Sequence, residues 1–242
     1  MSDRIDILGT EFDNITLDEA IDRAYCMIGS GKNHRIVTPN SEIVYMARKD
    51  DALRGVLNGS DLVVPDGIGV VHASKICKTP LRGKVAGIEL GEGLIARLAK
   101  EGGRIYFLGA KPGVAEAAAK ALCEKYPGLT VSGVHDGYFK EDDEVIKAIN
   151  AAHTDVLFVC LGAPKQELWM AKNQARIETS LMLGLGGSLD VFAGVAQRAP
   201  DIWIRLGLEW FYRLCKEPWR IGRMMALPKF LLTVIFSRKK GN

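Results

Sequence analysis

The sequence predicts an α/β protein with a Rossmann-like, mainly parallel sheet flanked by helices, followed by a basic C-terminal helical appendage. Short apolar runs alternate with longer helical patterns along most of the 242 residues, which is typical of βα units around a parallel sheet. After residue 200 the alternation stops, and a helical segment rich in aromatic and basic residues follows. We therefore expect a Rossmann-like domain over residues 1–200 and an appendage over residues 201–242.

Seven segments have the composition of strands, with apolar residues bounded by Gly, Pro, Asn or Asp. They are residues 4–12, 34–40, 61–67, 104–110, 129–137, 155–163 and 180–187. Six segments between them have helical periodicity, several with Thr, Ser or Pro in the cap or first turn. They are residues 16–31, 41–57, 87–102, 111–126, 141–153 and 165–177. A further helix is expected after residue 67, and Pro218 and Pro228 should divide the appendage into three helical pieces.

The net charge of +3 is unevenly distributed along the chain. From Arg205 to the end, nine Lys and Arg stand against two Glu, a net charge of +7, while the remainder has 23 basic and 27 acidic residues, a net charge of −4. This asymmetry indicates a polyanionic partner: nucleic acid, an anionic membrane surface, or the phosphates of a ligand. Because Trp, Leu, Ile and Phe are interleaved with the basic residues, as in interfacial helices, we favour the membrane over nucleic acid. The alternative is a helical cap that packs its apolar residues on the sheet.

Several classes of protein have little support in the sequence. The five cysteines lack CxxC spacing and the four histidines are far apart, so neither a disulfide framework nor a metal site is indicated. The patterns GxGxxG, GxxxxGK[ST] and GxSxG do not occur. The N-terminus does not resemble a signal peptide, and no segment approaches the ~20 apolar residues of a spanning helix. We expect a cytoplasmic protein that lies on the membrane rather than in it.

Small and polar residues follow the predicted strands. Thr38 and Asn40 lie at the end of the predicted strand over residues 34–40. Asp66 lies at the end of the next predicted strand, in the stretch "DLVVPDGIG". The carboxyl ends of parallel strands meet along one crevice, where helix N-termini bind anions, so a phosphate-bearing ligand such as a nucleotide fits this edge. An aspartate with an ordinary pKa of about 3.9 is ionised at neutral pH and can accept a proton from a hydroxyl group. Alternatively, Asn40 and Asp66 each cap the helix that follows.

Eight motifs follow one another along the chain: "TPNSEIV", "VPDGIGVVHASK", "KVAGIEL", "YFLGA", "HDGYF", "LGAPKQE", "GLGGSLDVFAG" and "RAPDIWIRLGLEWFYRLCKEPWRIGRM". Together and in this order they resemble the bacterial WecG/TagA/CpsF glycosyltransferases over nearly the whole chain. The resemblance implies an inverting enzyme on the inner face of the plasma membrane. It would transfer N-acetylmannosamine from a UDP donor to the 4-hydroxyl of undecaprenyl-diphosphate-linked N-acetylglucosamine, as in wall teichoic acid synthesis. A donor carrying the uronic acid form of the sugar is the alternative within the family.

The resemblance also implies roles for individual residues. Asp66 matches the proposed catalytic base, and Thr38, Asn40 and Gln166 match polar residues of the same pocket. Lys84 stands where relatives often carry arginine, and a lysine keeps the charge but not the bidentate geometry. The UDP pocket is expected to involve Gly109, Ala110, Tyr138, Gly162, Gly187 and Asp190. Arg213, Arg220 and Arg223 match basic residues of an appendage that closes over the site, and neither a metal nor another cofactor is expected.

A non-catalytic protein that binds a nucleotide sugar or a lipid phosphate on the same fold is the main rival from another class, since fold alone does not fix function. Such a protein has no need of Asp66. The sequence leaves the oligomeric state open, and a homo-oligomer is compatible with it.

Overall fold

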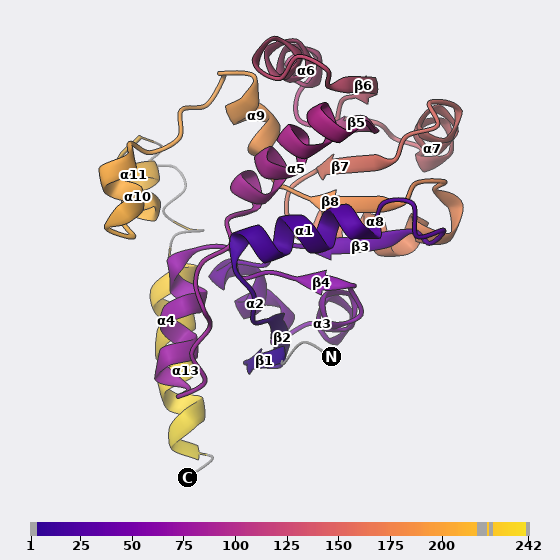
Figure 1. The fold of residues 1–242 in the computed structure, drawn as a ribbon. Coiled ribbons are helices and arrows are strands. Elements are labelled where there is room, and N and C mark those ends of the chain that lie inside the picture. Colours follow the sequence, from indigo (N-terminus) through magenta and orange to yellow (C-terminus); the bar gives the residue numbers. More distant parts are fainter. Residues whose placement is uncertain (1–3, 217–221, 223–224, 241–242) are drawn as a thin grey trace.

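The computed structural model describes residues 4–216, 222 and 225–240. Its centre is a parallel six-stranded sheet in the order β4-β3-β8-β7-β5-β6, with helices on both faces (Figure 1). The strands are β3 (His34–Val37), β4 (Leu62–Val63), β5 (Arg104–Gly109), β6 (Thr130–His135), β7 (Val156–Cys160) and β8 (Leu181–Gly184). The prediction of a Rossmann-like α/β fold is confirmed.

Two hydrophobic cores, one on each face of the sheet, hold the layers together. Successive strand residues alternate between them: Ile36 packs into one core and Val37 into the other. One core is covered by α1 (Leu17–Met27), α5 (Gly87–Glu101), α6 (Val114–Lys125) and α9 (Ser188–Phe192). The other is covered by α2 (Ser41–Ala47), α3 (Asp51–Asn58), α4 (Ile68–Ile76), α7 (Asp142–Ala151), α8 (Lys165–Asn173) and α13 (Ala226–Lys240). Burial on both faces explains why the central strands β7 and β8 are apolar throughout.

The prediction of a single strand over residues 4–12 is wrong. The segment forms an antiparallel hairpin of β1 (Arg4–Ile7) and β2 (Thr10–Asp13). Leu8 and Gly9 connect the two strands with φ of 55° and 89°, and a two-residue turn with two positive φ values has the twist that a hairpin needs. The hairpin packs beside β4, the edge strand of the main sheet.

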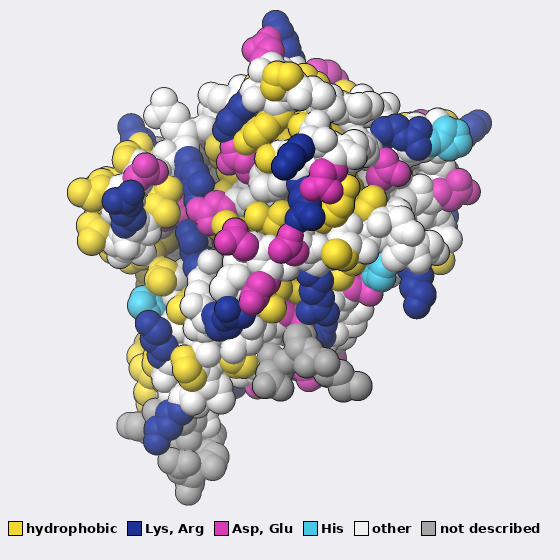
Figure 2. All heavy atoms as spheres, in the orientation of Figure 1, with side chains coloured by type: hydrophobic (Ala, Val, Ile, Leu, Met, Phe, Trp, Pro, Cys, Tyr) yellow, Lys and Arg dark blue, Asp and Glu magenta, His cyan; other side chains and the backbone are white. Residues whose placement is uncertain are grey.

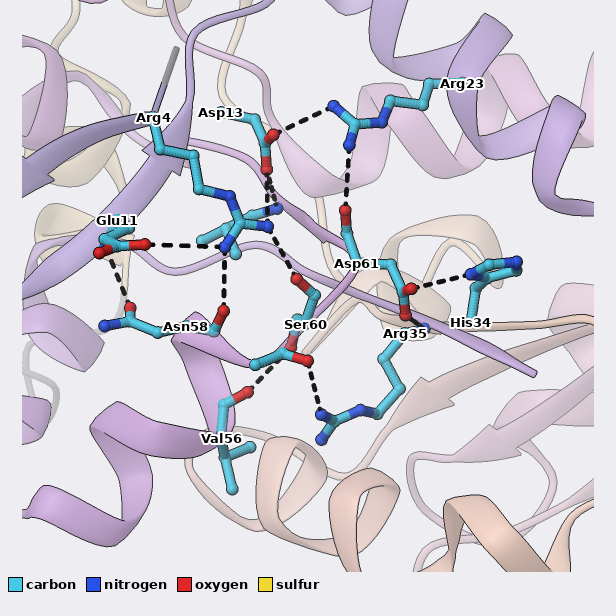
Figure 3. Close-up of polar contacts among 12 residues, drawn as sticks. Arg4, Glu11, Asp13, Arg23, His34, Arg35, Val56, Asn58, Ser60 and Asp61 are labelled. Carbon is cyan, nitrogen blue, oxygen red and sulfur yellow. Dashed lines mark hydrogen bonds and ion pairs between the residues drawn. The ribbon is translucent and has the colours of Figure 1, made fainter. Parts of the chain in front are cut away.

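Asp13, at the end of this hairpin, joins it to the sheet through a buried carboxylate (Figure 3). Oδ2 accepts a hydrogen bond from the backbone N–H of Val63 at 2.9 Å, and Oδ1 accepts one from Arg23 at 3.0 Å. Arg4 lies 3.4 Å from Oδ2 and also donates to the carbonyl oxygens of Asn58 and Ser60. One side chain therefore ties the hairpin, α1 and α3 to the short strand β4.

Two helix predictions also need correction. Residues 41–57 form two helices instead of one, because Asp50 caps a new helix by accepting a hydrogen bond from the Leu53 N–H at 3.0 Å. Pro228 lies in the first turn of α13, where proline is tolerated, so the break in the appendage comes before Ala226 and not at Pro228 itself. Pro218 lies outside the described residues. The division of the chain at residue 200 stays a prediction.

The C-terminal segment begins with α10 (Asp201–Arg205) and α11 (Glu209–Lys216), which lie to one side of the sheet (Figure 1). Helix α13 then returns along α4 and packs against α2 and α4, where it buries Phe230 and Val234. Within the described residues, no helix has the length and apolar character needed to cross a membrane.

We predict that Asp13→Asn lowers the free energy of unfolding by about 2–4 kcal/mol, because the substitution removes the charge that two arginines face. This range lies below the ~3–5 kcal/mol of a fully buried pair, since Arg4 and Arg23 are partly exposed. Urea denaturation measures the loss. Glu11→Gln is the control: Glu11 pairs with the same Arg4 but is half exposed, so a change of at most about 1 kcal/mol is expected. Equal losses in the two variants would contradict the role assigned to Asp13.

Candidate active site

Asp66 lies at the carboxyl edge of the sheet, just beyond β4. The chain stays beside β3 after the strand ends, because the N–H of Val64 donates to the carbonyl of Val37 at 3.0 Å and that of Asp66 to the carbonyl of Pro39 at 3.3 Å. Gly67, with φ of 86°, then turns the chain into α4. Gly67 is the N-cap residue of this helix. Asp66 therefore precedes the N-cap position, and the alternative hypothesis that its side chain caps α4 stays a prediction.

Asn40 and Thr38 lie next to Asp66 at the end of β3. The Asn40 side chain caps α2 by accepting hydrogen bonds from the N–H groups of Glu42 and Ile43 at 2.9 and 3.2 Å, so the capping hypothesis for Asn40 is confirmed. Thr38 is buried and donates to the carbonyl oxygen of Gly184 at 3.0 Å. Thr38 thus joins the ends of β3 and β8.

Gln166, in α8 after β7, is the next polar residue along this edge of the sheet, beyond Thr38 and β8. Its side chain is buried, accepts a hydrogen bond from the Gly186 N–H at 2.9 Å and donates one to Glu167 at 2.9 Å. Burial raises the pKa of Glu167, whose second carboxyl oxygen is buried without a hydrogen-bond partner. Glu167 orients the Gln166 amide, so that its oxygen faces the turn between β8 and α9. Sequence reasoning missed Glu167, although it follows Gln166 directly.

Lys84 reaches the same edge from the segment before α5. The neighbouring Val85 N–H donates to the carbonyl of Pro65 at 2.9 Å, which places this segment beside the approach to Asp66. The Lys84 ammonium lies 3.6 Å from the carboxylate of Glu209 in α11, and both side chains are mostly buried. Sequence reasoning did not predict this ion pair, because its partners are 125 residues apart in the chain.

A cavity of about 550 Å³ opens at the ends of β5, β6 and β7. Three of the residues predicted for a nucleotide pocket line it, namely Ala110, Tyr138 and Asp190. Lys111 and Lys165 also line it, and the sequence prediction missed both. The Lys165 ammonium donates to the carbonyl of Gly137 at 3.3 Å and lies 5.2 Å from the centre of the Phe139 ring. Two lysines, an exposed tyrosine and a carboxylate make this cavity suitable for an anionic ligand with an aromatic ring.

Cys160 also lines the cavity. Burial raises the pKa of its thiol to about 12, so the group is neutral at physiological pH and is not an activated nucleophile. The carboxylates of this edge, Asp66 and Asp190, are better suited to proton transfer and to hydrogen bonding with hydroxyl groups.

Three predicted glycines shape the turns around the cavity. Gly109 has φ of 134°, and a Cβ there would collide with the carbonyl oxygen of Cys160. Gly162 has φ of 77° and precedes α8, while Gly187 is the N-cap residue of α9. The positive φ at Gly109 and Gly162 explains why glycine stands at these two positions.

The three predicted arginines of the appendage are placed only in part. Arg213 belongs to α11, but its side chain is outside what the structure describes, and Arg220 and Arg223 lie outside the described residues. The structure does place α11 itself at this edge, through Glu209. The roles proposed for the arginines stay predictions.

Comparison with known proteins shows the enzyme family to which the chain is related. Residues 5–242 match the glycosyl transferase WecG/TagA/CpsF family. The chain belongs to this family. Two relatives from Staphylococcus aureus, strains MW2 and NCTC 8325 / PS 47, are named N-acetylglucosaminyldiphosphoundecaprenol N-acetyl-beta-D-mannosaminyltransferase. Each is 38% identical over 240 residues, which cover 98% of this chain and 94% of the relative.

The family membership confirms the resemblance and the prediction of a glycosyltransferase. A glycosyltransferase must bring a donor and an acceptor together, and in this structure two polar regions share one edge of the sheet. Asp66 follows β4, whereas the cavity lies at β7 and β5, three and four strands away. At the usual strand spacing this is about 14–19 Å.

Among the described residues, no group of three or more His, Cys, Asp or Glu is arranged to hold a metal ion, and metal independence stays a prediction.

We predict that Gly109→Ala destabilises the protein by more than the ~1–2 kcal/mol that a positive φ costs an alanine, because the new methyl group also meets the Cys160 carbonyl. Gly113→Ala is the matched control, since Gly113 has φ of 83° with open space around its Cα. Thermal denaturation of the two variants measures the difference. If Gly109→Ala loses no more stability than Gly113→Ala, the turn at Gly109 can shift to accommodate the methyl group, and the steric account is contradicted.

Proposed function

We propose that this enzyme transfers N-acetylmannosamine from UDP-N-acetylmannosamine to the 4-hydroxyl of undecaprenyl-diphosphate-linked N-acetylglucosamine, with inversion at the anomeric carbon. The observation that carries the proposal is the position of Asp66 at the same sheet edge as a cavity lined by Lys111, Lys165 and Asp190. The names of the relatives from Staphylococcus aureus support the acceptor and the sugar.

The cavity at β5, β6 and β7 is the proposed donor site. Tyr138, whose side chain is 68% exposed, offers a ring on which a uracil can stack, and Asp190 can accept hydrogen bonds from ribose hydroxyls. Lys111 and Lys165 supply positive charge for the diphosphate. From this cavity an extended nucleotide sugar would point along the strand ends toward Asp66.

Asp66 is the proposed catalytic base. As the 4-oxygen of the acceptor forms its bond to the anomeric carbon of the donor, the bond from that carbon to the UDP oxygen breaks. The proton of the 4-hydroxyl passes to the Asp66 carboxylate, and UDP leaves with the electron pair of the broken bond. Attack from the face opposite UDP inverts the configuration, and general-base catalysis of this kind is worth about 10²–10⁴ in rate.

The departing UDP gains negative charge, which must be stabilised as it develops. Lys84, near Asp66, and the cavity lysines are the proposed cations for this step, together with the appendage arginines. The two cavity lysines would face a diphosphate bound in the cavity, and Lys84 would supply positive charge nearer Asp66, without a metal ion.

Docking on an anionic membrane would bring the enzyme to a lipid-linked acceptor. On the face shown in Figure 2, hydrophobic and basic side chains gather over α10 and α11. Ile202 and Leu206 in this region are 65% and 66% exposed, and Phe236 of α13 is 59% exposed. Exposed apolar residues among basic ones are typical of segments that bind the interface of a bilayer. We therefore propose a peripheral location on the inner face of the membrane.

We predict that Asp66→Asn lowers the rate of acceptor-dependent UDP release by about 10²–10⁴ and leaves the affinity for UDP unchanged. UDP release is measured with UDP-N-acetylmannosamine, and separately with its uronic acid form, in the presence of a lipid-diphosphate-linked N-acetylglucosamine. Asp61→Asn is the control, because Asp61 precedes the same strand at the opposite end, where it pairs with His34; this change should alter stability but not turnover. Full turnover in Asp66→Asn would exclude Asp66 as the base. If the wild type binds UDP but releases none from the donor sugar, a binding protein would be favoured over an enzyme.

We also predict that transfer continues at an undiminished rate in the presence of EDTA, since lysines and arginines are proposed to neutralise the diphosphate. The measurement compares initial rates with EDTA and with added Mg²⁺ or Mn²⁺. Loss of activity with EDTA and its recovery with one of these ions would show that a metal takes part.

A further inference from the structure

Two close contacts hold the C-terminal segment against the start of α4, next to Asp66. At Gly207, between α10 and α11, a Cβ would lie 3.1 Å from the side chain of Ile68. At Gly69, the residue that follows Ile68 in α4, a Cβ would lie 2.5 Å from Leu227 of α13 and would collide with Ser41. The two glycines allow the C-terminal segment to approach the helix that begins just after Asp66.

Two ion pairs connect the same segment to residues 84–89, which run beside Pro65. Arg198, in the connection between α9 and α10, pairs with Glu89 in the first turn of α5. Glu209, in the first turn of α11, pairs with Lys84 at 3.6 Å. Arg198 precedes α10 in the chain, whereas Glu209 belongs to α11 itself. The Lys84–Glu209 pair therefore fixes the position of α11 relative to the catalytic edge.

We propose that Glu209 is a positioning residue that occupies Lys84 until a substrate diphosphate takes its place. This inference rests on the function proposed above. The Glu209 carboxylate holds the Lys84 ammonium at the site and keeps α11 docked over it. An incoming diphosphate carries more negative charge than a carboxylate, so Lys84 exchanges one anion for the other, while the contact of Gly207 with Ile68 keeps α11 beside the site.

A purely structural ion pair would behave differently. If Glu209 only stabilised the docked helix, its loss would loosen α11 and leave diphosphate affinity unchanged or weaker. If Glu209 competes with the diphosphate for Lys84, its loss must strengthen diphosphate binding. A gain of affinity on removing a carboxylate is thus the result that separates the two accounts.

The test measures the affinity of two probes by calorimetry: UDP, which represents the donor, and geranyl diphosphate, which represents the lipid acceptor. Glu209→Gln should bind at least one of them about two- to fivefold more tightly than the wild type, as expected for the loss of a partly exposed ion pair. The probe whose affinity increases identifies which diphosphate, that of the donor or that of the acceptor, binds to Lys84. Glu209→Asp, which keeps the charge, and Asp201→Asn, which removes an exposed carboxylate from α10, should both bind like the wild type.

The gain in diphosphate affinity must also depend on Lys84. In the double variant Lys84→Met with Glu209→Gln, the affinity should fall to that of Lys84→Met alone. Amide hydrogen exchange in α11 should be faster in Lys84→Met and in the double variant than in the wild type. Unchanged or weaker binding of both probes by Glu209→Gln would overturn this inference alone, whatever the transfer assay shows. A wild-type chain that binds neither probe would overturn the proposed function as well.

Discussion

Two backbone hydrogen bonds, from Val64 to Val37 and from Asp66 to Pro39, determine where the Asp66 carboxylate, the proposed base, lies. They extend the pairing of β4 with β3 beyond a strand of only two residues. The opposite side of β4 is held by the buried carboxylate of Asp13, which binds the Val63 N–H and two arginines. An edge strand this short has little pairing of its own, so the hairpin at the N-terminus is part of what positions the site.

The parallel sheet then brings the other polar groups to the same edge. Thr38 joins the ends of β3 and β8, and Gln166 holds the turn that follows β8. Both side chains are buried and hydrogen-bonded, which suits groups that set the shape of a site. The lysines around the cavity and Lys84 lie on different loops, so an extended nucleotide sugar that runs along the strand ends would meet cations at both ends of the row. The C-terminal segment covers the Asp66 end of this row through contacts that only glycines at positions 69 and 207 allow.

Much of this arrangement could be predicted from the sequence, because buried parallel strands are apolar throughout and end in small or polar residues. The hairpin was missed because residues 4–12 are apolar enough for one strand, and only the positive φ of Leu8 and Gly9 divides them. Asp66, Thr38, Asn40 and Gln166 were found from their motifs. Lys111, Lys165 and Glu209 were not, since a surface lysine or glutamate has no local feature that shows which loop or helix it will face. Only the folded chain brings them to the site.

The central claim is that a nucleotide sugar bound in the cavity at β5 and β7 presents its anomeric carbon to Asp66 after β4. A crystal structure of the enzyme with UDP tests this most directly. We expect the uracil and ribose between Tyr138 and Asp190, the phosphates near Lys111 or Lys165, and the β-phosphate directed along the strand ends toward Asp66. A UDP molecule bound away from this cavity, or one whose β-phosphate points toward β6, would contradict the account.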